Sequence, residues 1–451
     1  MTTSGDESGP SNGAHSRVDP DRRRAARRQA DVLRVLQGGD RSASLRMIDR
    51  IGARRAGRTD HVQFDVEVIQ GREVLPQRSE LLAPAAQFNA RGGQDIASAA
   101  GFRADSVQAL DDRVVLLHRD GASRASLSSL RTDLAAVDIP SSFAYVTPNK
   151  IVMKSGESPR RLVGLPPSPG SSTTDPGVGP VTVAVLDTGI YASARTDGWL
   201  SGLENSATRD PLDVLPAPNK LLDVAAGHGT FIAGVVAQVD PALRIEVRRV
   251  LDTDGIASEV DVAVALVQVV RDLLQLNGRL VVNLSLGTET LEDQPPVALA
   301  TALELVREHE DSIGGEVLIV TAAGNDSWDR RCWPAAFAEH DDKVVAVAAL
   351  DLDLTPADWS TYGSWVTCST VGEAVVSTFV HGREDPQIDP DAESFPPDAW
   401  AYWSGTSFAA PRVAAEIASR AHGSGSSLAA ALHDLLATGQ PTPGYGRRLD
   451  L

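Results

Sequence analysis

The sequence has only two cysteines, Cys332 and Cys368, among its 451 residues. Two cysteines exclude a disulfide framework and a four-cysteine metal site, and leave open a single bridge between them. No uninterrupted apolar run approaches the ~18 to 20 residues that span a bilayer. The polar, arginine-containing N-terminus also lacks the apolar core of a signal peptide. The sequence therefore predicts a cytoplasmic protein without a membrane span.

Basic residues are scarce in the second part of the chain. Of the 42 Lys and Arg and the 60 Asp and Glu, residues 1–170 hold 25 and 20, whereas residues 171–451 hold 17 and 40. The acidic second part argues against a nucleic acid as its substrate, because phosphate backbones bind basic surfaces. The opposite signs of the two parts allow them to attract each other across an interface.

The first part of the chain predicts several segments. Residues 1–58 are expected to form a disordered tail and a short charged helix, at about 21–36. Residues 59–155 predict a small α+β domain, and its βαββαβ order suits a ferredoxin-like sandwich. Residues 156–180 are rich in Pro, Gly and Ser in their second half and predict an exposed linker. The strands and helices of the small domain are expected, in chain order, at 61–69, 92–102, 105–110, 113–119, 126–137 and 143–153.

Residues 181–440 predict an α/β domain, followed by a C-terminal tail at 441–451. Apolar runs at 181–189, 244–251, 279–287, 316–325 and 343–350 alternate with helical patterns at 231–239, 259–275, 296–310 and 407–420. Continuous apolar strands separated by helices indicate a parallel sheet that is flanked by helices and buried on both faces. In such sheets the functional site lies beyond the carboxyl ends of the strands.

Three residues with useful chemistry lie at these strand ends and helix starts. Asp187 ends "VTVAVLD", His228 lies between two glycines in "GHGTFIAGVVA", and Ser407 begins a helical pattern in "SGTSFAAPRVAA". Each has an ordinary interpretation, as a capping carboxylate, a packed histidine or a helix N-cap. Taken together, they follow one of the known chain orders of the Asp, His and Ser catalytic triad.

With these motifs, the chain resembles the subtilisin-like serine peptidases, the subtilase family. "VAVLDTGI", "GHGTFIAGVVA" and "SGTSFAAPRVAA" match its three signature blocks, and "NLSLG" and "TAAGN" match two further segments, over about residues 180–437. The resemblance implies a subtilisin-like parallel sheet and a serine endopeptidase that acts on protein or peptide substrates. It implies Ser407 as the nucleophile, His228 as the base and Asp187 as the group that orients the imidazole, in one hydrogen-bonded row.

The resemblance also implies further site residues. Asn325 is expected to donate its side-chain amide to the oxyanion. The substrate is expected to bind in extended form along one segment and to place a side chain in a pocket lined by another. These substrate-binding residues are Ser285, Leu286 and Gly287 in the first segment and Ala323 and Gly324 in the second. No metal ligands are predicted, because the short "AQVDPALRIEV" replaces a longer loop that binds calcium in many family members; calcium is not indicated.

The resemblance leaves two questions open. Subtilases commonly carry an N-terminal βαββαβ prodomain, so residues 59–155 are expected to be either an intramolecular inhibitor or a partner-binding, regulatory module. The whole chain is accordingly either an active endopeptidase made as a zymogen, or an inactive or autoinhibited scaffold that binds peptides with the same fold. Neither a membrane nor a nucleic acid is expected as a partner of the catalytic domain.

Overall fold

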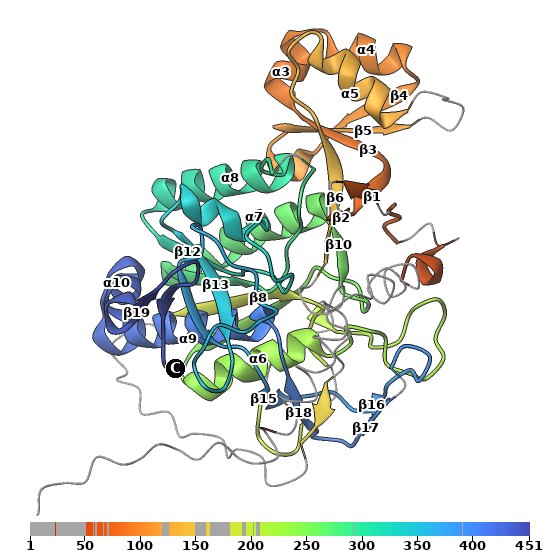
Figure 1. Cartoon of the computed structure of the whole chain (residues 1–451). Helices are drawn as coiled ribbons and strands as arrows, with labels where there is room; N and C mark the ends of the chain where they lie inside the picture. The colour runs from red at the N-terminus through yellow and green to blue at the C-terminus, as the bar shows by residue number, and fades with distance from the viewer. Residues whose placement is uncertain are drawn as a thin grey trace, which may run out of the picture.

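A computed structural model describes most of the chain (Figure 1). The expected tail, most of the charged helix and most of the linker lie outside the described residues. None of the helices in the described part combines the length and the apolar character needed to cross a bilayer. The structure describes residues 23, 51–56, 58, 61–65, 67–69, 72–119, 126–148, 159–162, 181–191, 195–201, 203, 208–291, 293–389 and 391–451.

An eight-stranded sheet forms the centre of the larger part of the molecule. Its strand order is β19-β20-β14-β13-β12-β11-β8-β9, and all strands except β19 run parallel. The strands are β8 (Thr182–Asp187), β9 (Arg244–Arg249), β11 (Arg279–Leu284), β12 (Glu316–Ala322), β13 (Val344–Leu350), β14 (Cys368–Val371), β19 (Gln440–Thr442) and β20 (Gly446–Arg448). Every residue of β8, β13 and β14 is buried, as expected for a parallel sheet covered on both faces. The predicted α/β fold is confirmed.

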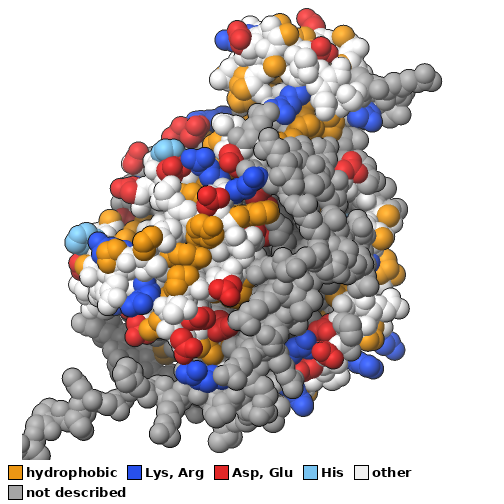
Figure 2. Space-filling view, in the orientation of Figure 1, with side chains coloured by type: hydrophobic (Ala, Val, Ile, Leu, Met, Phe, Trp, Pro, Cys, Tyr) orange, Lys and Arg blue, Asp and Glu red, His pale blue; other side chains and the backbone are white. Residues whose placement is uncertain are grey.

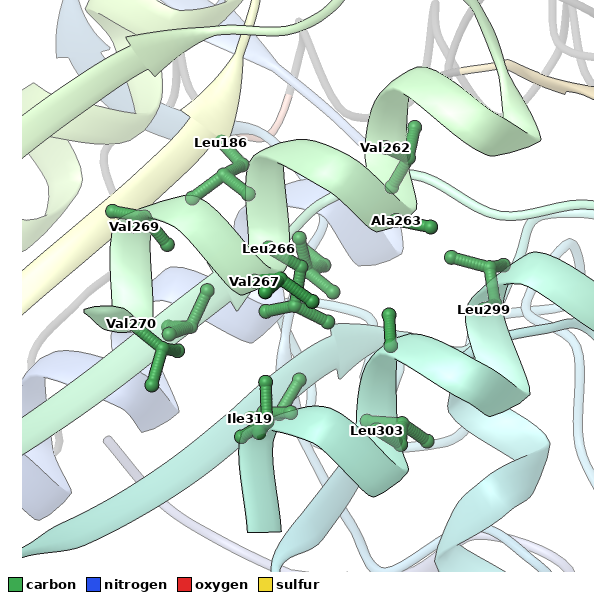
Figure 3. Packing of buried hydrophobic residues seen from close by; sticks show 14 of the residues in the cluster. Leu186, Val262, Ala263, Leu266, Val267, Val269, Val270, Leu299, Leu303 and Ile319 are labelled. Carbon is green, nitrogen blue, oxygen red and sulfur yellow. The ribbon is translucent and has the colours of Figure 1, made fainter. Parts of the chain in front are cut away.

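Helices cover both faces of this sheet (Figure 1). The helices α7 (Glu259–Asn277) and α8 (Val297–Ile313) lie on one face, and α6 (His228–Val239), α9 (Thr406–Ser424) and α10 (Leu428–Thr438) lie on the other. Figure 3 shows the apolar side of α7 packed against α8 and against Leu186 and Ile319 of the sheet. Helix α7 starts where Ser258 accepts a hydrogen bond from the Asp261 amide and ends at Gly278 in the left-handed region.

The smaller part is an antiparallel sheet with helices, built from the N-terminal region. Its order is β10-β6-β3-β5-β4, in which β10 (Ile256–Ser258) comes from the larger part. The other elements are β3 (Pro76–Pro84), α3 (Ala85–Ala90), α4 (Gly93–Ala99), β4 (Phe102–Ser106), β5 (Val114–Arg119), α5 (Leu127–Ala135) and β6 (Ser142–Pro148). We call residues 76–148 the N-terminal domain. An antiparallel α+β sheet is therefore present where the sequence predicts one.

The prediction was wrong about the first strand of this domain. The sequence favours 61–69 because its apolar residues alternate, but the strand that starts the βαββαβ order is β3. The first half of β3 reads Pro-Gln-Arg-Ser-Glu, which hides its apolar alternation. Residues 67–69 instead form β1 (Glu67–Ile69) in a hairpin with β2 (Arg72–Val74). The strand predicted at 105–110 also begins earlier, as β4, and ends in a 3-10 turn over Gln108–Leu110.

The N-terminal domain sits on α7 and α8 (Figure 1). Four of its apolar side chains belong to the same buried cluster as those two helices: Leu82, Leu110, Val114 and Ala144. Smaller sheets pair β7 (Arg160–Arg161) with β18 (Trp400–Trp403), β18 with β15 (Val375–Thr378), and β16 (Gly382–Arg383) with β17 (Ser394–Phe395). Residues of the expected C-terminal tail form β19 and β20, and Leu449 is fully buried. Both cysteines are free and buried, so the bridge between them is not formed.

Candidate active site

The predicted site residues gather at the carboxyl edge of the large sheet. Asp187 is the last residue of β8, Ser285 follows β11, and Ala323 follows β12. These three strands are neighbours and run parallel, so their ends meet at one edge. Ser407 at the start of α9 reaches the same edge, because its carbonyl accepts a hydrogen bond of 2.7 Å from the Ser285 hydroxyl.

Asp187 and His228, the predicted acid and base, form a hydrogen-bonded pair. The Nδ1 atom of His228 lies 2.6 Å from Oδ1 of Asp187, and both side chains are fully buried. The same carboxylate oxygen accepts the Thr188 amide at 2.8 Å. Gly227, which precedes the histidine, has a φ of 83°, and a Cβ there would lie 2.8 Å from Val380. Glycine is therefore required to turn the chain into α6 with the imidazole facing Asp187.

Aromatic rings hold the imidazole from the sides. The ring of Trp403 meets the His228 ring edge-on with centroids 5.5 Å apart, and the ring of Phe408 lies 5.4 Å away. Phe231, three residues after His228, packs against both of these rings. Such packing fixes the plane of the imidazole, because each edge contact favours one orientation.

The serine hydroxyl is not bonded to the histidine in this state. Ser407 Oγ donates to the Ser285 carbonyl at 3.2 Å, while His228 Nε2 is buried and has no hydrogen-bond partner in the part of the chain that the structure describes. Phe408 follows Ser407 in the chain and touches the imidazole, so serine and histidine belong to one site. The expected row is thus complete between acid and base, and a side-chain rotation of the serine is needed to extend it.

Asn325 presents a free amide donor at the same edge. Its Oδ1 accepts the Thr406 amide at 3.0 Å and the Thr406 hydroxyl at 2.9 Å. Because an amide N–H can only donate, Oδ1 must face Thr406 and Nδ2 must face away from it. Nδ2 is buried and has no partner among the described residues. Sequence reasoning had not assigned Thr406 a function, and it sets the orientation of the predicted oxyanion donor.

The five predicted substrate-binding residues lie at this edge and are buried. Leu286 belongs to the core beneath α7 and α8, and Ala323 to a cluster around Trp333. Gly324 has a φ of 114° and donates its amide to the Thr406 hydroxyl at 3.1 Å. All five are Ser285, Leu286, Gly287, Ala323 and Gly324. The structure places these five residues at the edge of the sheet that also carries Asp187 and Ser407.

Asp210 is a buried residue at the site that sequence reasoning missed. Its carboxylate accepts the Thr188 hydroxyl at 3.0 Å, the Gly227 amide at 2.8 Å and the Leu212 amide at 3.0 Å. Burial raises the pKa of Asp210 to about 6. The surrounding sequence "TRDPLD" predicts only a turn, because Asp-Pro is typical of turns.

The contacts of Asp210 link the two segments that carry the acid and the base. Thr188 follows Asp187, and its hydroxyl both donates to Asp210 and accepts the Gly229 amide at 3.1 Å. The residues on both sides of His228 are therefore held by the Asp210 and Thr188 side chains. This arrangement fixes the distance between acid and base independently of their own hydrogen bond.

The side chains of Asp187, His228 and Ser407 have no exposed surface in this structure. Among the described residues, no three His, Cys, Asp or Glu side chains are grouped so that they could hold a metal ion. On the face shown in Figure 2, the visible Lys and Arg side chains of the described part are scattered among acidic ones. That surface differs from the continuous basic patches that bind nucleic acids.

Known proteins resemble this chain in sequence and in fold. A family model described as the subtilase family matches residues 179–426. The thermophilic serine proteinase of Bacillus sp. (strain AK1) is 29% identical over 247 residues, covering 51% of this chain and 50% of that protein. Subtilisin DY of Bacillus licheniformis is 27% identical over 247 residues, covering 52% and 74%. The chain thus spans only about half the length of the first of these relatives.

The fold similarity reaches further along the chain than the family model does. The crystal structure of fervidolysin from Fervidobacterium pennivorans, described as a keratinolytic enzyme related to subtilisin, is 18% identical to this chain. It aligns over 86% of this chain and 61% of its own, with a TM-score of 0.56. The aligned share exceeds residues 179–426, so the similarity in fold includes part of the chain outside that range.

Proposed function

Because this chain belongs to the subtilase family, we propose that it is a serine endopeptidase that hydrolyses peptide bonds of protein substrates. One observation carries the proposal: two of the buried polar atoms without a hydrogen-bond partner among the described residues, His228 Nε2 and Asn325 Nδ2, belong to the same site as Ser407. Buried polar atoms are almost always paired, so two unpaired ones beside a serine need an explanation. Peptide hydrolysis supplies it, since Nε2 takes the serine proton and Nδ2 donates to the substrate oxygen.

The reaction follows from these positions. Ser407 Oγ turns from the Ser285 carbonyl toward His228, gives its proton to Nε2 and bonds to the scissile carbonyl carbon. Asp187 accepts the hydrogen bond from Nδ1 and stabilises the imidazolium. Asn325 Nδ2 and the backbone amide of Ser407 donate to the oxyanion. His228 then gives the proton to the leaving amine, and a water molecule, deprotonated by the same nitrogen, releases the acyl group from Ser407.

The substrate is expected to bind mainly through its backbone. Ser285, Leu286 and Gly287 continue the chain beyond the carboxyl end of β11, and their main chain is proposed to pair with an extended peptide. Ala323 and Gly324 are small, so they leave room for the side chain that precedes the scissile bond. Main-chain pairing tolerates many side chains, which fits an endopeptidase with broad sequence preference.

The N-terminal domain is proposed to act as an intramolecular inhibitor, and the described state as a latent one. Its strand order β6-β3-β5-β4 and its antiparallel pairing fit the ferredoxin-like sandwich. Its last strand, β6, pairs with β10, and Ile256 and Ser258 at the two ends of β10 are buried. The closed triad and the serine turned away from the histidine favour a latent state over an open one. A partner-binding module is the alternative.

Labelling with a fluorophosphonate probe, which reacts only with an activated serine, tests the activity. The wild-type chain should be labelled and Ser407→Ala should not. Limited proteolysis that removes the N-terminal domain should speed the labelling if that domain inhibits, and should leave it unchanged if the domain is a partner-binding module. Absence of labelling before and after proteolysis, in folded protein, would contradict the peptidase and favour the scaffold. Mass spectrometry of a digested peptide library then gives the cleavage preference.

A further inference from the structure

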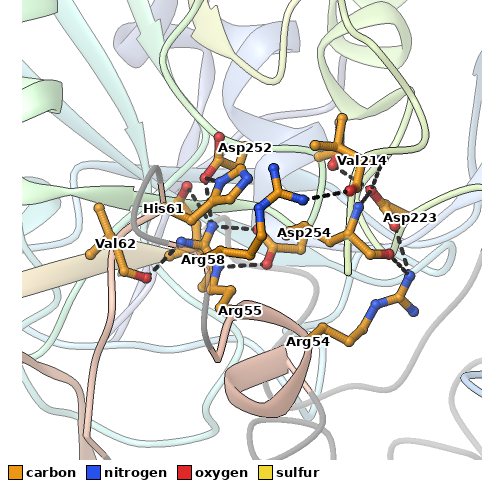
Figure 4. A network of polar contacts seen from close by, with 12 residues as sticks. Arg54, Arg55, Arg58, His61, Val62, Val214, Asp223, Asp252 and Asp254 are labelled. Carbon is orange, nitrogen blue, oxygen red and sulfur yellow. Dashed lines mark hydrogen bonds and ion pairs between the residues drawn. The ribbon is translucent and has the colours of Figure 1, made fainter. Parts of the chain in front are cut away.

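A short segment before the N-terminal domain is bound to the larger part by two arginines, Arg54 and Arg55, of which Arg55 is buried (Figure 4). We call residues 51–56, 58 and 61–65 the arm; residues 51–55 are helical. Arg55 has no exposed surface, and its guanidinium makes a two-pronged contact with Asp254, at 2.7 Å from each oxygen. The same group bonds to Asp252 at 2.8 Å. A two-pronged, buried arginine and carboxylate pair is among the strongest and most directional polar contacts.

The neighbouring arginine, Arg54, binds a second loop. Arg54 lies 2.8 Å from Asp223 and 3.2 Å from Asp385, and it also donates to the Leu215 carbonyl. The carboxylate of Asp223 is only 1% exposed. Figure 4 shows the two arginines leaving the same helical turn and reaching opposite loops. The arm therefore joins two loops that are distant in the sequence.

The loop held by Arg55 supports the catalytic acid and base directly. Asp252 follows Leu251, whose amide donates to the Asp187 carbonyl at 3.1 Å. Thr253 lies between Asp252 and Asp254, the two aspartates that Arg55 binds, and its carbonyl accepts the Ala225 amide at 2.8 Å.

The Ala225 carbonyl in turn accepts the His228 amide at 3.1 Å. The loop held by Arg54 joins the same network, because Asp223 accepts the Thr253 hydroxyl at 2.6 Å and its carbonyl accepts the Ala226 amide at 3.0 Å. Both arginines thus hold backbone that positions Asp187 and His228, without touching either residue.

We propose that Arg54 and Arg55 are positioning residues of the peptidase and that the arm belongs to the active enzyme, even when the N-terminal domain that follows it is removed. The proposal rests on the proposed function, since it concerns the geometry of the same triad. Loss of the arm would leave the carboxylates of Asp223 and Asp254 buried without their cations, and the two loops would rearrange to hydrate them. The acid and base would then lose their spacing.

The first test compares Arg55 with Arg113, a second arginine of the N-terminal region that also forms an ion pair with a carboxylate of the larger part. Arg55→Ala should lower kcat on a cleaved peptide about tenfold to 100-fold with little change in KM, because small displacements of catalytic groups are costly in rate. The matched control is Arg113→Ala, which removes an exposed pair with Glu308 on α8; it should leave kcat unchanged. Millimolar guanidinium should restore part of the Arg55→Ala rate, since it fits the vacated site between the aspartates. Equal kcat in Arg55→Ala and wild type would overturn the proposal.

A second readout separates this proposal from the peptidase activity. The proton in the short His228 and Asp187 hydrogen bond should give a low-field NMR signal in wild type and in Arg113→Ala, and should lose it in Arg55→Ala. This signal does not require turnover, so it tests the arm even if the peptidase proposal fails. Should Arg55→Ala not fold, Arg55→Lys replaces it; that variant keeps the charge, loses the two-pronged contact and should weaken the signal. An unchanged signal in either variant contradicts the positioning role.

The third test asks whether the arm remains bound to the peptidase after proteolysis has removed the N-terminal domain. Wild-type protein activated by proteolysis should be labelled with the fluorophosphonate probe, isolated by size in its folded state and analysed by mass spectrometry. We expect the labelled species to contain a fragment with residues 51–58 alongside the peptidase. An isolated, labelled species that lacks this fragment and keeps full kcat would overturn the proposal.

Discussion

The candidate active site and the interface beneath the N-terminal domain each contain a fully buried carboxylate, Asp210 and Glu259. The two carboxylates differ in which part of the chain donates their hydrogen bonds. At the site, the bonds that Asp210 accepts from described residues come from the larger part of the molecule, through Thr188, Gly227 and Leu212. At the interface, the first residue of α7, Glu259, accepts the Ala298 amide of α8 at 2.8 Å and an amide of the N-terminal domain at 3.3 Å. Dissociation of that domain changes the second carboxylate and not the first.

The rest of the interface is also less completely packed than the site. The ion pair between Arg113 and Glu308 crosses it with 39% and 57% of the side chains exposed, and Arg271 and Asp111 are similarly open. A cavity of about 980 Å³ lies at the interface, lined by Ala85 and neighbours on one side and Leu291 and neighbours on the other. Exposed pairs are weak and screened by salt. The comparison is consistent with the proposal that the N-terminal domain is released while the site keeps its contacts.

The largest effect is expected from Asn325→Ala at the site. Removal of one oxyanion donor costs about 10²–10³ in kcat, a range found in a subtilisin. KM should change little, because Nδ2 binds the oxyanion more tightly than the substrate carbonyl. Steady-state kinetics on a peptide substrate measure both constants, and Asn325→Asp serves as a control that keeps the size but loses the donor. A fall in kcat below threefold would remove Asn325 from the reaction.

Asp210→Ala should lower kcat about tenfold to 100-fold, because it frees the Thr188 hydroxyl and the Gly227 amide that space the acid and base. Asp210→Asn keeps one carbonyl oxygen facing these two donors and should recover most of the rate. Unlike a change at Glu259, neither Asp210 variant should promote opening of the N-terminal domain. If Asp210→Ala lowers the melting temperature and leaves kcat intact, the residue has only a structural role.

Glu259 should make opening of the N-terminal domain depend on pH. Burial raises the pKa of Glu259 to about 7 from an ordinary value of 4.5. The closed state therefore binds the proton more tightly than an open state in which Glu259 is hydrated. The closed state is therefore most favoured at a pH below the ordinary pKa of Glu259. As pH rises from that value to the pKa in the closed state, the equilibrium constant for closure falls by up to about tenfold per pH unit.

Hydrogen exchange of the β6 amides, corrected for the intrinsic pH dependence of exchange, measures this opening. Wild type should open more readily as pH rises to about 7 and then level off, whereas Glu259→Gln should show little pH dependence. The same profile in wild type and Glu259→Gln would contradict the difference between the two carboxylates.

The sequence alone predicted the parts of this molecule that carry a short local motif or a continuous apolar run. The motifs around Asp187, His228 and Ser407 name both the residue and its place at a strand end or helix start. The apolar runs predicted β8, β9, β11, β12 and β13 because buried parallel strands leave a continuous signal. The pairing of Asn325 with Thr406 also lies within the predicted motifs, although its direction required the coordinates.

The residues that were missed act through long-range contacts. Asp210 lies 18 positions before His228 in a segment that reads as a turn, and Arg55 meets carboxylates 197 and 199 positions away. No local pattern distinguishes such a residue from a solvated charge. The strand β3 was missed for a related reason, because neighbouring strands and not its own polar first half decide its pairing.

The smallest effect is expected from Arg113→Ala at the interface. Its guanidinium bonds Glu308 at 2.6 and 2.8 Å, which by distance alone resembles the buried Arg55 contact. Water reaches both partners, so hydration replaces most of the lost attraction. Opening of the N-terminal domain, measured by hydrogen exchange of β6, should rise about twofold or less, and the difference from wild type should vanish in high salt. A tenfold rise would mean that exposed pairs hold the domain after all, and the contrast between a fixed site and a releasable domain would no longer follow from burial.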